Sequence, residues 1–177
     1  MNTILEPKIV GPILEPMIAE IQQEAATTKR VLERVPGDKL AWKPHPKSMS
    51  LGQLAMHIAT IPGGVTKIAQ VDEFEVNPAN FTPPSPNSTL EILAALDASV
   101  KAAEQYLGGV SESAAAGNWR AMANGKEVMN MPRATMLRSI LLNHWYHHRG
   151  QLSVYLRLLD VPVPSIYGPS ADESPFT

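Results

Sequence analysis

The feature that most limits the fold of this chain is a repeated apolar spacing of four and three residues along the stretch that follows Pro132. Side chains at this spacing lie on one stripe of an α-helix. We therefore expect one long helix over 132–159, ended by the proline-containing run 161–164. Its predicted inner stripe consists of Leu137, Leu141, His144, His148, Gln151, Tyr155 and Leu158.

The same spacing recurs in three earlier segments, at 12–35, 50–68 and 88–109. Ser50 with Gln53, and Ser88 with Glu91, have the spacing of a capping box, in which two side chains satisfy the free amides at a helix start. Four helices of comparable length predict an all-α fold, a four-helix bundle. The predicted inner stripes of the three segments are Leu14, Ile18, Ile21, Ala25, Thr28, Leu32 and Val35; then Leu54, His57, Ile61, Gly64 and Ile68; then Leu93, Leu96, Val100, Ala103 and Leu107.

The connections carry turn signals. Segment 72–87 is rich in proline and asparagine and predicts an irregular crossover at the rim of a pocket. Between the third and fourth helices, Asn124-Gly125 permits a small β-hairpin, because both residues tolerate positive φ angles. The Pro62-Gly63-Gly64 triplet predicts a kink or interruption that opens space beside His57. With 177 residues, we expect residues 1–177 to form a single domain.

Composition excludes several classes of protein. The 15 basic and 17 acidic residues are interspersed and give a net charge of -2, so no basic face is available for nucleic acid. The chain contains no cysteine, which excludes disulfides and thiolate metal ligands. No segment approaches the ~20 apolar residues that cross a membrane. We expect a cytoplasmic protein without nucleic-acid or membrane partners.

Three of the five histidines fall on the predicted apolar stripes. His144 and His148 are four residues apart and share one helix face, and His57 lies on a different helix. Buried imidazoles need partners for their ring nitrogens, which either a hydrogen-bond network or a shared metal ion can provide. We favour a three-histidine site for Zn, Ni, Fe or Cu with at least one open position. The other two, His45 and His147, lie off the stripes, and we expect a supporting or packing role for His147.

Several motifs then resemble those of DinB-like (damage-inducible) proteins. They are HWYHHRGQL at 144–152, VPSIYGP at 163–169, LAWKP at 40–44 and SLGQLAMH at 50–57. The resemblance covers nearly the whole chain and implies a four-helix bundle, often a homodimer. It also implies one divalent metal ion bound by His57, His144 and His148. Related families use this scaffold for metal-dependent transferases that act with a low-molecular-weight thiol.

Three functions remain open from the sequence. In a thiol transferase, Arg149, Lys67 or Arg138 are candidates to bind the anionic parts of the thiol. In a hydrolase using metal-activated water, Asp72 or Glu73 are candidates for the general base, since Trp145 occupies the position of the glutamate in H-E-x-x-H. In a non-catalytic stress-response protein, the bound ion chiefly stabilises the fold. For Arg149 and Gln151 we expect either orientation of the metal ligands or helix-end packing.

Overall fold

Two serines begin helices where the sequence predicts them. The computed structural model describes residues 11–77 and 82–176. Ser50 begins α2 (Leu51–Ile68): its Oγ accepts the N–H of Gln53 at 3.1 Å, and Gln53 Oε1 accepts the N–H of Ser50 at 3.0 Å. Ser88 begins α3 (Thr89–Gly109) by accepting the N–H of Glu91 at 3.2 Å. The predicted start of each helix is therefore confirmed.

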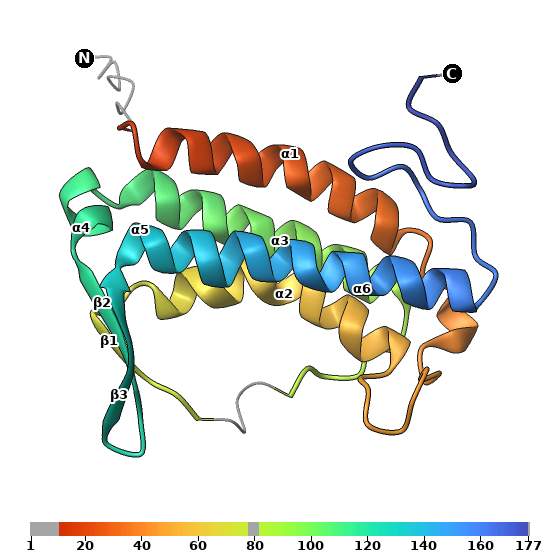
Figure 1. Ribbon diagram of the computed structural model, residues 1–177, viewed down its shortest axis with the longest axis horizontal. Helices are drawn as coiled ribbons and strands as arrows, with labels where there is room; N and C mark the ends of the chain where they lie inside the picture. Colours follow the sequence, from red (N-terminus) through yellow and green to blue (C-terminus); the bar gives the residue numbers. More distant parts are fainter. Residues whose placement is uncertain (1–10, 78–81, 177) are drawn as a thin grey trace, which may run out of the picture.

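The protein is mostly helical. After α1 (Leu14–Leu32), α2 and α3, the last helical segment is a continuous rod built from three parts. These parts are α5 (Arg133–Met136), a π-helical stretch (Leu137–Asn143) and α6 (His144–Leu158). Helix α3 packs on α2 and α1, while α6 packs on α2 and α1 (Figure 1). Shorter elements are a 3-10 turn (Gly37–Lys39) and α4 (Glu112–Ala116).

A small three-stranded sheet lies at one end of the helices (Figure 1). Strands β2 (Asn118–Ala123) and β3 (Lys126–Pro132) form the expected antiparallel hairpin, with Asn124 at φ 52° and Gly125 at φ 72° in its turn. Strand β1 (Glu73–Glu75) pairs with β2 in parallel. The segment 72–87 was predicted to be an irregular crossover, and this prediction is wrong for the residues that form β1. Residues 78–81 of the same segment lie outside the described residues. The all-α prediction thus included the hairpin of β2 and β3 but not the third strand, β1.

Helix α2 runs through Pro62 without the interruption that was one of the two effects predicted for the Pro62-Gly63-Gly64 triplet. A proline has no N–H, so the carbonyl of Ile58 loses its helical partner. Trp145 of α6 replaces it, because its Nε1–H donates to the Ile58 carbonyl at 2.9 Å. The proline therefore frees an acceptor that joins α2 to α6.

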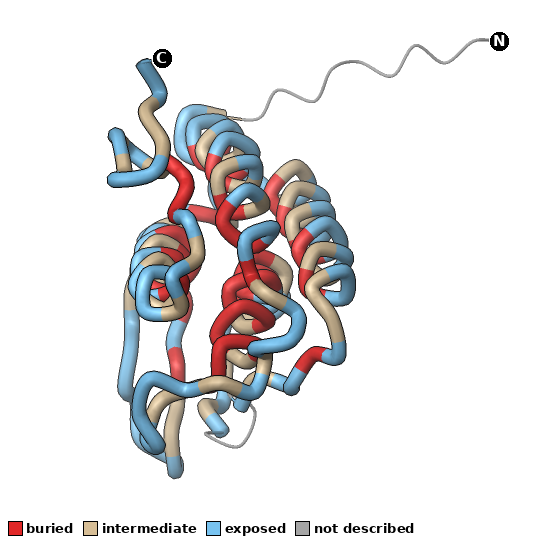
Figure 2. Tube along the Cα trace, turned by 90° about the vertical axis from the view of Figure 1, so that its right-hand side faces the viewer, coloured by how far each residue is buried: buried red, intermediate tan, exposed pale blue. Residues whose placement is uncertain are grey.

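The buried face of the C-terminal rod differs from the predicted stripe by one residue beyond Leu141. A π-helical turn contains more residues than an α-helical turn, so the stretch at Leu137–Asn143 rotates the positions that follow it. Gln151 and Leu158 of the predicted stripe are exposed. Figure 2 shows that the buried parts of the chain lie between the helices. The buried positions of the rod from Leu137 onward are Leu137, Leu141, Leu142, Trp145, His148, Arg149, Leu152 and Leu156. In the described part of the chain, no helix is both long and apolar enough to cross a membrane.

Candidate metal centre

The structure brings together the three histidines that the sequence selects. His57 comes from the middle of α2, and His144 and His148 come from successive turns of α6. One ring nitrogen from each of the three lies within 4.8 Å of the other two. His57 Nε2 and His144 Nε2 are 3.1 Å apart. Among the described residues, no other His, Asp or Glu joins this group.

Gln151 fixes the ring of His148. His148 Nδ1 lies 2.7 Å from Gln151 Oε1. A carbonyl oxygen only accepts hydrogen bonds, so Nδ1 carries the proton and donates it. In this tautomer Nε2 holds the free lone pair that a metal ion requires. Of the two roles expected for Gln151, the hydrogen bond agrees with orientation of a triad histidine and not with helix-end packing, although the side chain lies on the exposed face of α6.

The environment favours neutral imidazoles. Burial, together with the nearby His148 and His144, lowers the pKa of His57 to about 4. Burial likewise lowers the pKa of His144 to about 4, with added effects of His148 and His147. Burial also lowers the pKa of His148, against the opposing effect of the Gln151 hydrogen bond. Neutral imidazole is the form that binds a metal ion, so all three rings are ready to do so near pH 7.

The remaining two histidines lie outside the group. His45 is exposed in the loop before α2, where its Nδ1 accepts the N–H of Lys47 at 3.2 Å. His147 is exposed on α6, with its ring centroid 5.0 Å from that of His148. His147 thus contacts a member of the triad without joining it.

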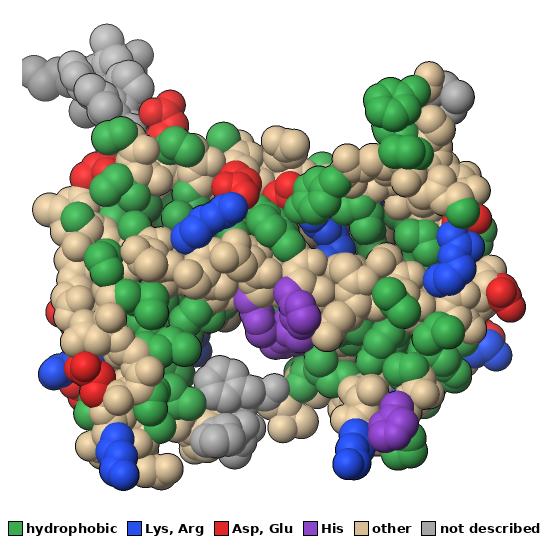
Figure 3. Space-filling view, viewed as in Figure 1, with side chains coloured by type: hydrophobic (Ala, Val, Ile, Leu, Met, Phe, Trp, Pro, Cys, Tyr) green, Lys and Arg blue, Asp and Glu red, His purple; other side chains and the backbone are tan. Residues whose placement is uncertain are grey.

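A cavity of about 670 Å³ opens beside His57 and His144. Figure 3 shows histidine side chains on this face next to a hollow bordered by hydrophobic side chains. The α2 side of the cavity is formed by His57, Ile61, Gly64 and Ile68, the residues that the sequence analysis placed in the core. The fully buried core side chains of α2 that do not line the cavity include Leu51, Leu54, Ala55 and Ile58, whereas Ile61 and Val65 are buried and also border the cavity. The apolar spacing at 57, 61, 64 and 68 therefore marks the wall of a pocket.

Comparison with known proteins gives the family. The model of the DinB family matches residues 9–175. The chain belongs to the DinB family. Over 43 residues it is 44% identical to the uncharacterized protein YrdA of Bacillus subtilis (strain 168), a match that covers 24% of this chain and 25% of YrdA.

Solved structures share this DinB-family fold. A DinB-like protein from Bacillus cereus ATCC 10987 has a TM-score of 0.68 at 23% identity, covering 86% of this chain and 97% of that one. The DinB-like protein YjoA from Bacillus subtilis has a TM-score of 0.65 at 16% identity, covering 86% and 98%. At these identities the likeness concerns the fold alone.

Arg149, which follows the triad in this DinB-family chain, is buried in an ion-pair cluster. The residue is 1% exposed, and its guanidinium lies 2.6 Å from Glu24 Oε2 of α1. It also donates to Thr28 Oγ1 at 3.0 Å and to the hydroxyl of Tyr167, whose own O–H donates to Glu24 at 3.0 Å. The rings of Tyr146 and Tyr167 cover the guanidinium, with centroids 5.4 and 5.1 Å from Cζ. Arg149 is therefore not available to bind an anionic thiol and instead joins α1, α6 and the C-terminal tail.

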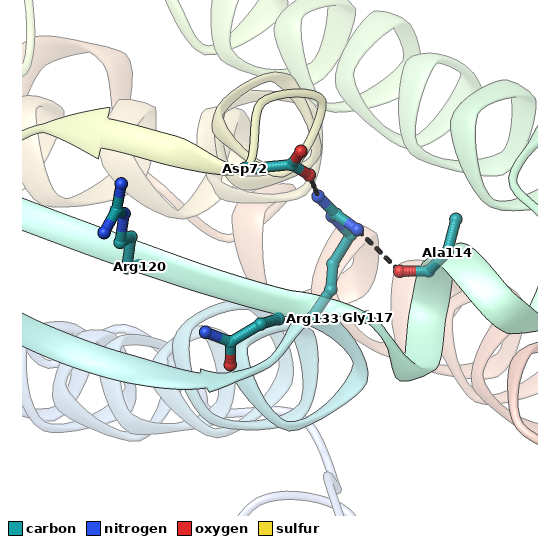
Figure 4. Close-up of a pocket in the computed structure, with 6 residues that line it drawn as sticks. Asp72, Ala114, Gly117, Arg120 and Arg133 are labelled. Atoms are coloured by element: carbon teal, nitrogen blue, oxygen red, sulfur yellow. Dashed lines mark hydrogen bonds and ion pairs between the residues drawn. The ribbon is translucent and has the colours of Figure 1, made fainter.

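A second hollow, of about 470 Å³, lies around Arg133 and is structural (Figure 4). Arg133 points between Asp72 and Ala114, and its Nε and Nη1 donate to the carbonyls of Ala69 and Ala114 at 2.8 and 2.5 Å. It also forms an ion pair with Asp72, while Glu73 pairs with Arg120 at 2.6 Å. Asp72 and Glu73 are absent from the residues that line the histidine cavity. The two carboxylates proposed as general bases are therefore engaged elsewhere.

Sequence reasoning missed the roles of Arg133 and Glu24. Both are charged residues that lie next to the predicted apolar stripes, and each is buried at 5–6% exposure. The predicted stripes gave no signal for them, because neither residue occupies a stripe position; a buried charge requires a partner, and these partners come from distant parts of the chain.

Proposed function

We propose that this DinB-family protein binds one divalent transition metal ion through His57, His144 and His148. The convergence of three imidazole nitrogens beside an open cavity carries this proposal. Zinc bonds to histidine nitrogen at about 2.0–2.1 Å, so two ligands of one tetrahedral ion lie roughly 3.3 Å apart. The 3.1 Å between His57 Nε2 and His144 Nε2 is compatible with this requirement. Zn, Ni and Fe all suit a donor set of neutral imidazoles.

We further propose that the protein is a metal-dependent transferase acting with a low-molecular-weight thiol. A divalent ion supplies Lewis acidity, which lowers the pKa of a thiol and yields a thiolate able to attack an electrophilic carbon. The chain supports this use in two ways. It has no cysteine to compete for the ion. Three protein ligands and a neighbouring cavity leave room for a fourth ligand from solution.

Hydrolysis by metal-activated water is the second candidate function, and it requires a general base. Among the described residues that line the cavity, none is a carboxylate. The third candidate is a non-catalytic stress-response protein, for which a closed site is expected. The lack of a carboxylate among the described lining residues favours the transferase over the hydrolase, and the open cavity beside His57 and His144 favours it over the non-catalytic protein.

The arrangement of the long helices supports a four-helix bundle, in which α5, the π-helical stretch and α6 count as one helix. We also propose a homodimer, on the basis of family membership. Size-exclusion chromatography with light scattering distinguishes a mass of two chains from a mass of one.

Metal content is the first test. The protein is purified without a nickel column, and its metals are measured by mass spectrometry. We expect about one metal ion per chain, lost in His57→Ala, His144→Ala and His148→Ala. His45→Ala and His147→Ala are matched controls that keep the metal, because both side chains are exposed outside the triad. Equal metal content in all five variants would refute the site.

The transferase activity is tested separately with the metal-loaded protein. Saturable loss of a cellular thiol in the presence of a model electrophile is expected for the wild type and for His147→Ala, and it should be absent in His148→Ala. Ester or amide hydrolysis without any thiol turnover would instead support the hydrolase.

A further inference from the structure

The cavity beside the histidines is elongated along one face of α2. His57, Ile61, Gly64 and Ile68 follow one another at helical spacing on its wall, and Lys67 lies beside Ile68. An α-helix rises 1.5 Å per residue, so the backbone positions of His57 and Lys67 are roughly 15 Å apart along the axis. The wall of the cavity therefore runs along α2 from the triad to the lysine.

Apolar side chains form most of the wall between the triad and the lysine. They come from α2, from the segment around β1, from the segment before α3 and from the C-terminal rod, and they include Ile61, Ile68, Phe74, Pro83 and Ile140. At about 670 Å³ the cavity has the size of a small-molecule site. Its middle is open, because a Cβ added at Gly64 would meet no atom within 4 Å.

Lys67 supplies the cavity with a positive charge that no carboxylate neutralises. Among the described residues that line the cavity, it is the only Lys, Arg, Asp or Glu. The acidic residues that follow α2 are engaged, Asp72 with Arg133 and Glu73 with Arg120. No carboxylate of the described chain lies within ion-pair distance of the Lys67 ammonium. An apolar cavity with one unpaired cation on its wall, away from the triad, is complementary to an apolar monoanion.

We propose that this cavity binds an elongated, mostly apolar molecule with a single carboxylate, which pairs with Lys67 while the other end of the molecule lies at the three histidines. The orientation rests on the proposed function, in which this molecule is the electrophile that receives the thiol. A cavity with one cation and apolar walls suits that partner better than a thiol with several charges.

Calorimetric titration with octanoate and its uncharged counterpart 1-octanol tests the proposal. The titrations are made on zinc-loaded protein and repeated on chelator-treated protein. We expect octanoate to bind both forms about two- to fivefold more tightly than 1-octanol, the range of a partly exposed ion pair. Butanoate should bind more weakly than octanoate by roughly fourfold per missing methylene, because each methylene leaves water for the apolar wall.

Two pairs of variants locate the ligand. Lys67→Met keeps the apolar stem and should remove the preference for octanoate over 1-octanol, whereas Lys101→Met, an exposed lysine on α3, should not. Gly64→Leu should fill the cavity and weaken both ligands at least tenfold. Gly150→Leu is the matched control, since Gly150 is also helical with no atom within 4 Å of an added Cβ and does not line the cavity. Thermal unfolding of each variant checks that the fold is retained.

Three results would overturn the proposal: octanoate binding unchanged by Lys67→Met, equal binding of octanoate and 1-octanol, or binding of neither ligand. Octanoate binding that is lost on zinc removal yet insensitive to Lys67→Met would place the carboxylate on the metal and would overturn the proposal as well.

The titration of chelated protein separates this test from the test of the proposed function. Absence of bound metal refutes the transferase and leaves the titration valid, whereas failure of the titration leaves the metal site intact.

Discussion

Gln151 is the residue on which the orientation of His148 depends. Removing the acceptor of the Nδ1–H frees the ring to rotate and to exchange tautomers. We expect Gln151→Ala to weaken zinc binding about tenfold, at the lower end of such effects because the amide is exposed. Competition with a chromophoric chelator measures the affinity. Gln105→Ala, an exposed glutamine on α3, is the control, and equal weakening in both variants would contradict the role of Gln151.

The lowered histidine pKa values make the metal-free protein sensitive to acid. The pKa values of His57 and His144 are about 4 in the folded chain, against 6.5 for the unperturbed side chain. Between these values the unfolded state binds more protons, so the free energy of unfolding falls as the pH falls from 6.5 to 4. Urea unfolding of chelated protein at several pH values measures this slope.

A double variant isolates the histidine contribution to this acid sensitivity. His57→Leu with His144→Leu should flatten the dependence between pH 6.5 and 4. His45→Leu should leave it unchanged, because that ring is exposed in the loop. Parallel curves for the wild type and the double variant would assign the acid sensitivity to other groups.

At the scale of elements, α1, α6 and the C-terminal tail meet at the pair of Arg149 and Glu24. Both side chains are almost fully buried, at 2% and 7% exposure. Arg149→Met leaves a buried carboxylate without its cation, which costs about 3 kcal/mol of unfolding free energy. Lys29→Met removes the exposed pair with Asp97 and should cost less than about 0.5 kcal/mol.

The double variant Arg149→Met with Glu24→Gln checks the cause of that loss. Because it removes both charges, it should be less destabilised than the sum of the two single variants. Urea unfolding measures all four proteins, and additive losses would show that the two side chains act independently.

The sequence located the elements better than the faces that they bury. Ser50, Ser88 and Asn124-Gly125 predicted two helix starts and a hairpin turn, because capping and turn formation depend on residues near in the chain. The predicted buried face of the last helix was shifted by one residue beyond Leu141, because the π-helical stretch rotates the residues that follow it about the helix axis. Such a stretch has no local signature in the apolar spacing.

At the scale of the whole molecule, one bound ion would link α2 to α6. A ligand that binds only the folded state stabilises it by RT ln(1 + [L]/Kd), about 2.7 kcal/mol at a free concentration of 100 Kd. We therefore expect chelation to lower the Tm of the zinc-loaded protein by roughly 5–10 °C. Differential scanning calorimetry measures this shift. His148→Ala should show no such shift, and an unchanged wild-type Tm would argue against a link between the two helices.

The sequence by itself determined the helical class, the family and the three histidines that come together. Helical spacing and the H-x-x-x-H pattern depend on local geometry, so they can be read along the chain. His57 could be selected because it occupies a helix position otherwise reserved for apolar residues.

Only the tertiary structure decided what surrounds those histidines. The spacing of His57, Ile61, Gly64 and Ile68 is the same for a core face and for a pocket wall, and the packing of β1 and the C-terminal rod against α2 makes it a wall. Likewise, Arg149 and Lys67 are both cations close to the triad: Arg149 follows His148 in the chain, and Lys67 lines the same cavity as His57 and His144. Their roles differ because Glu24 of α1 neutralises Arg149, whereas no carboxylate of the described chain reaches Lys67. Partners far apart in the chain decide the role of each charge, and only folding brings them into contact.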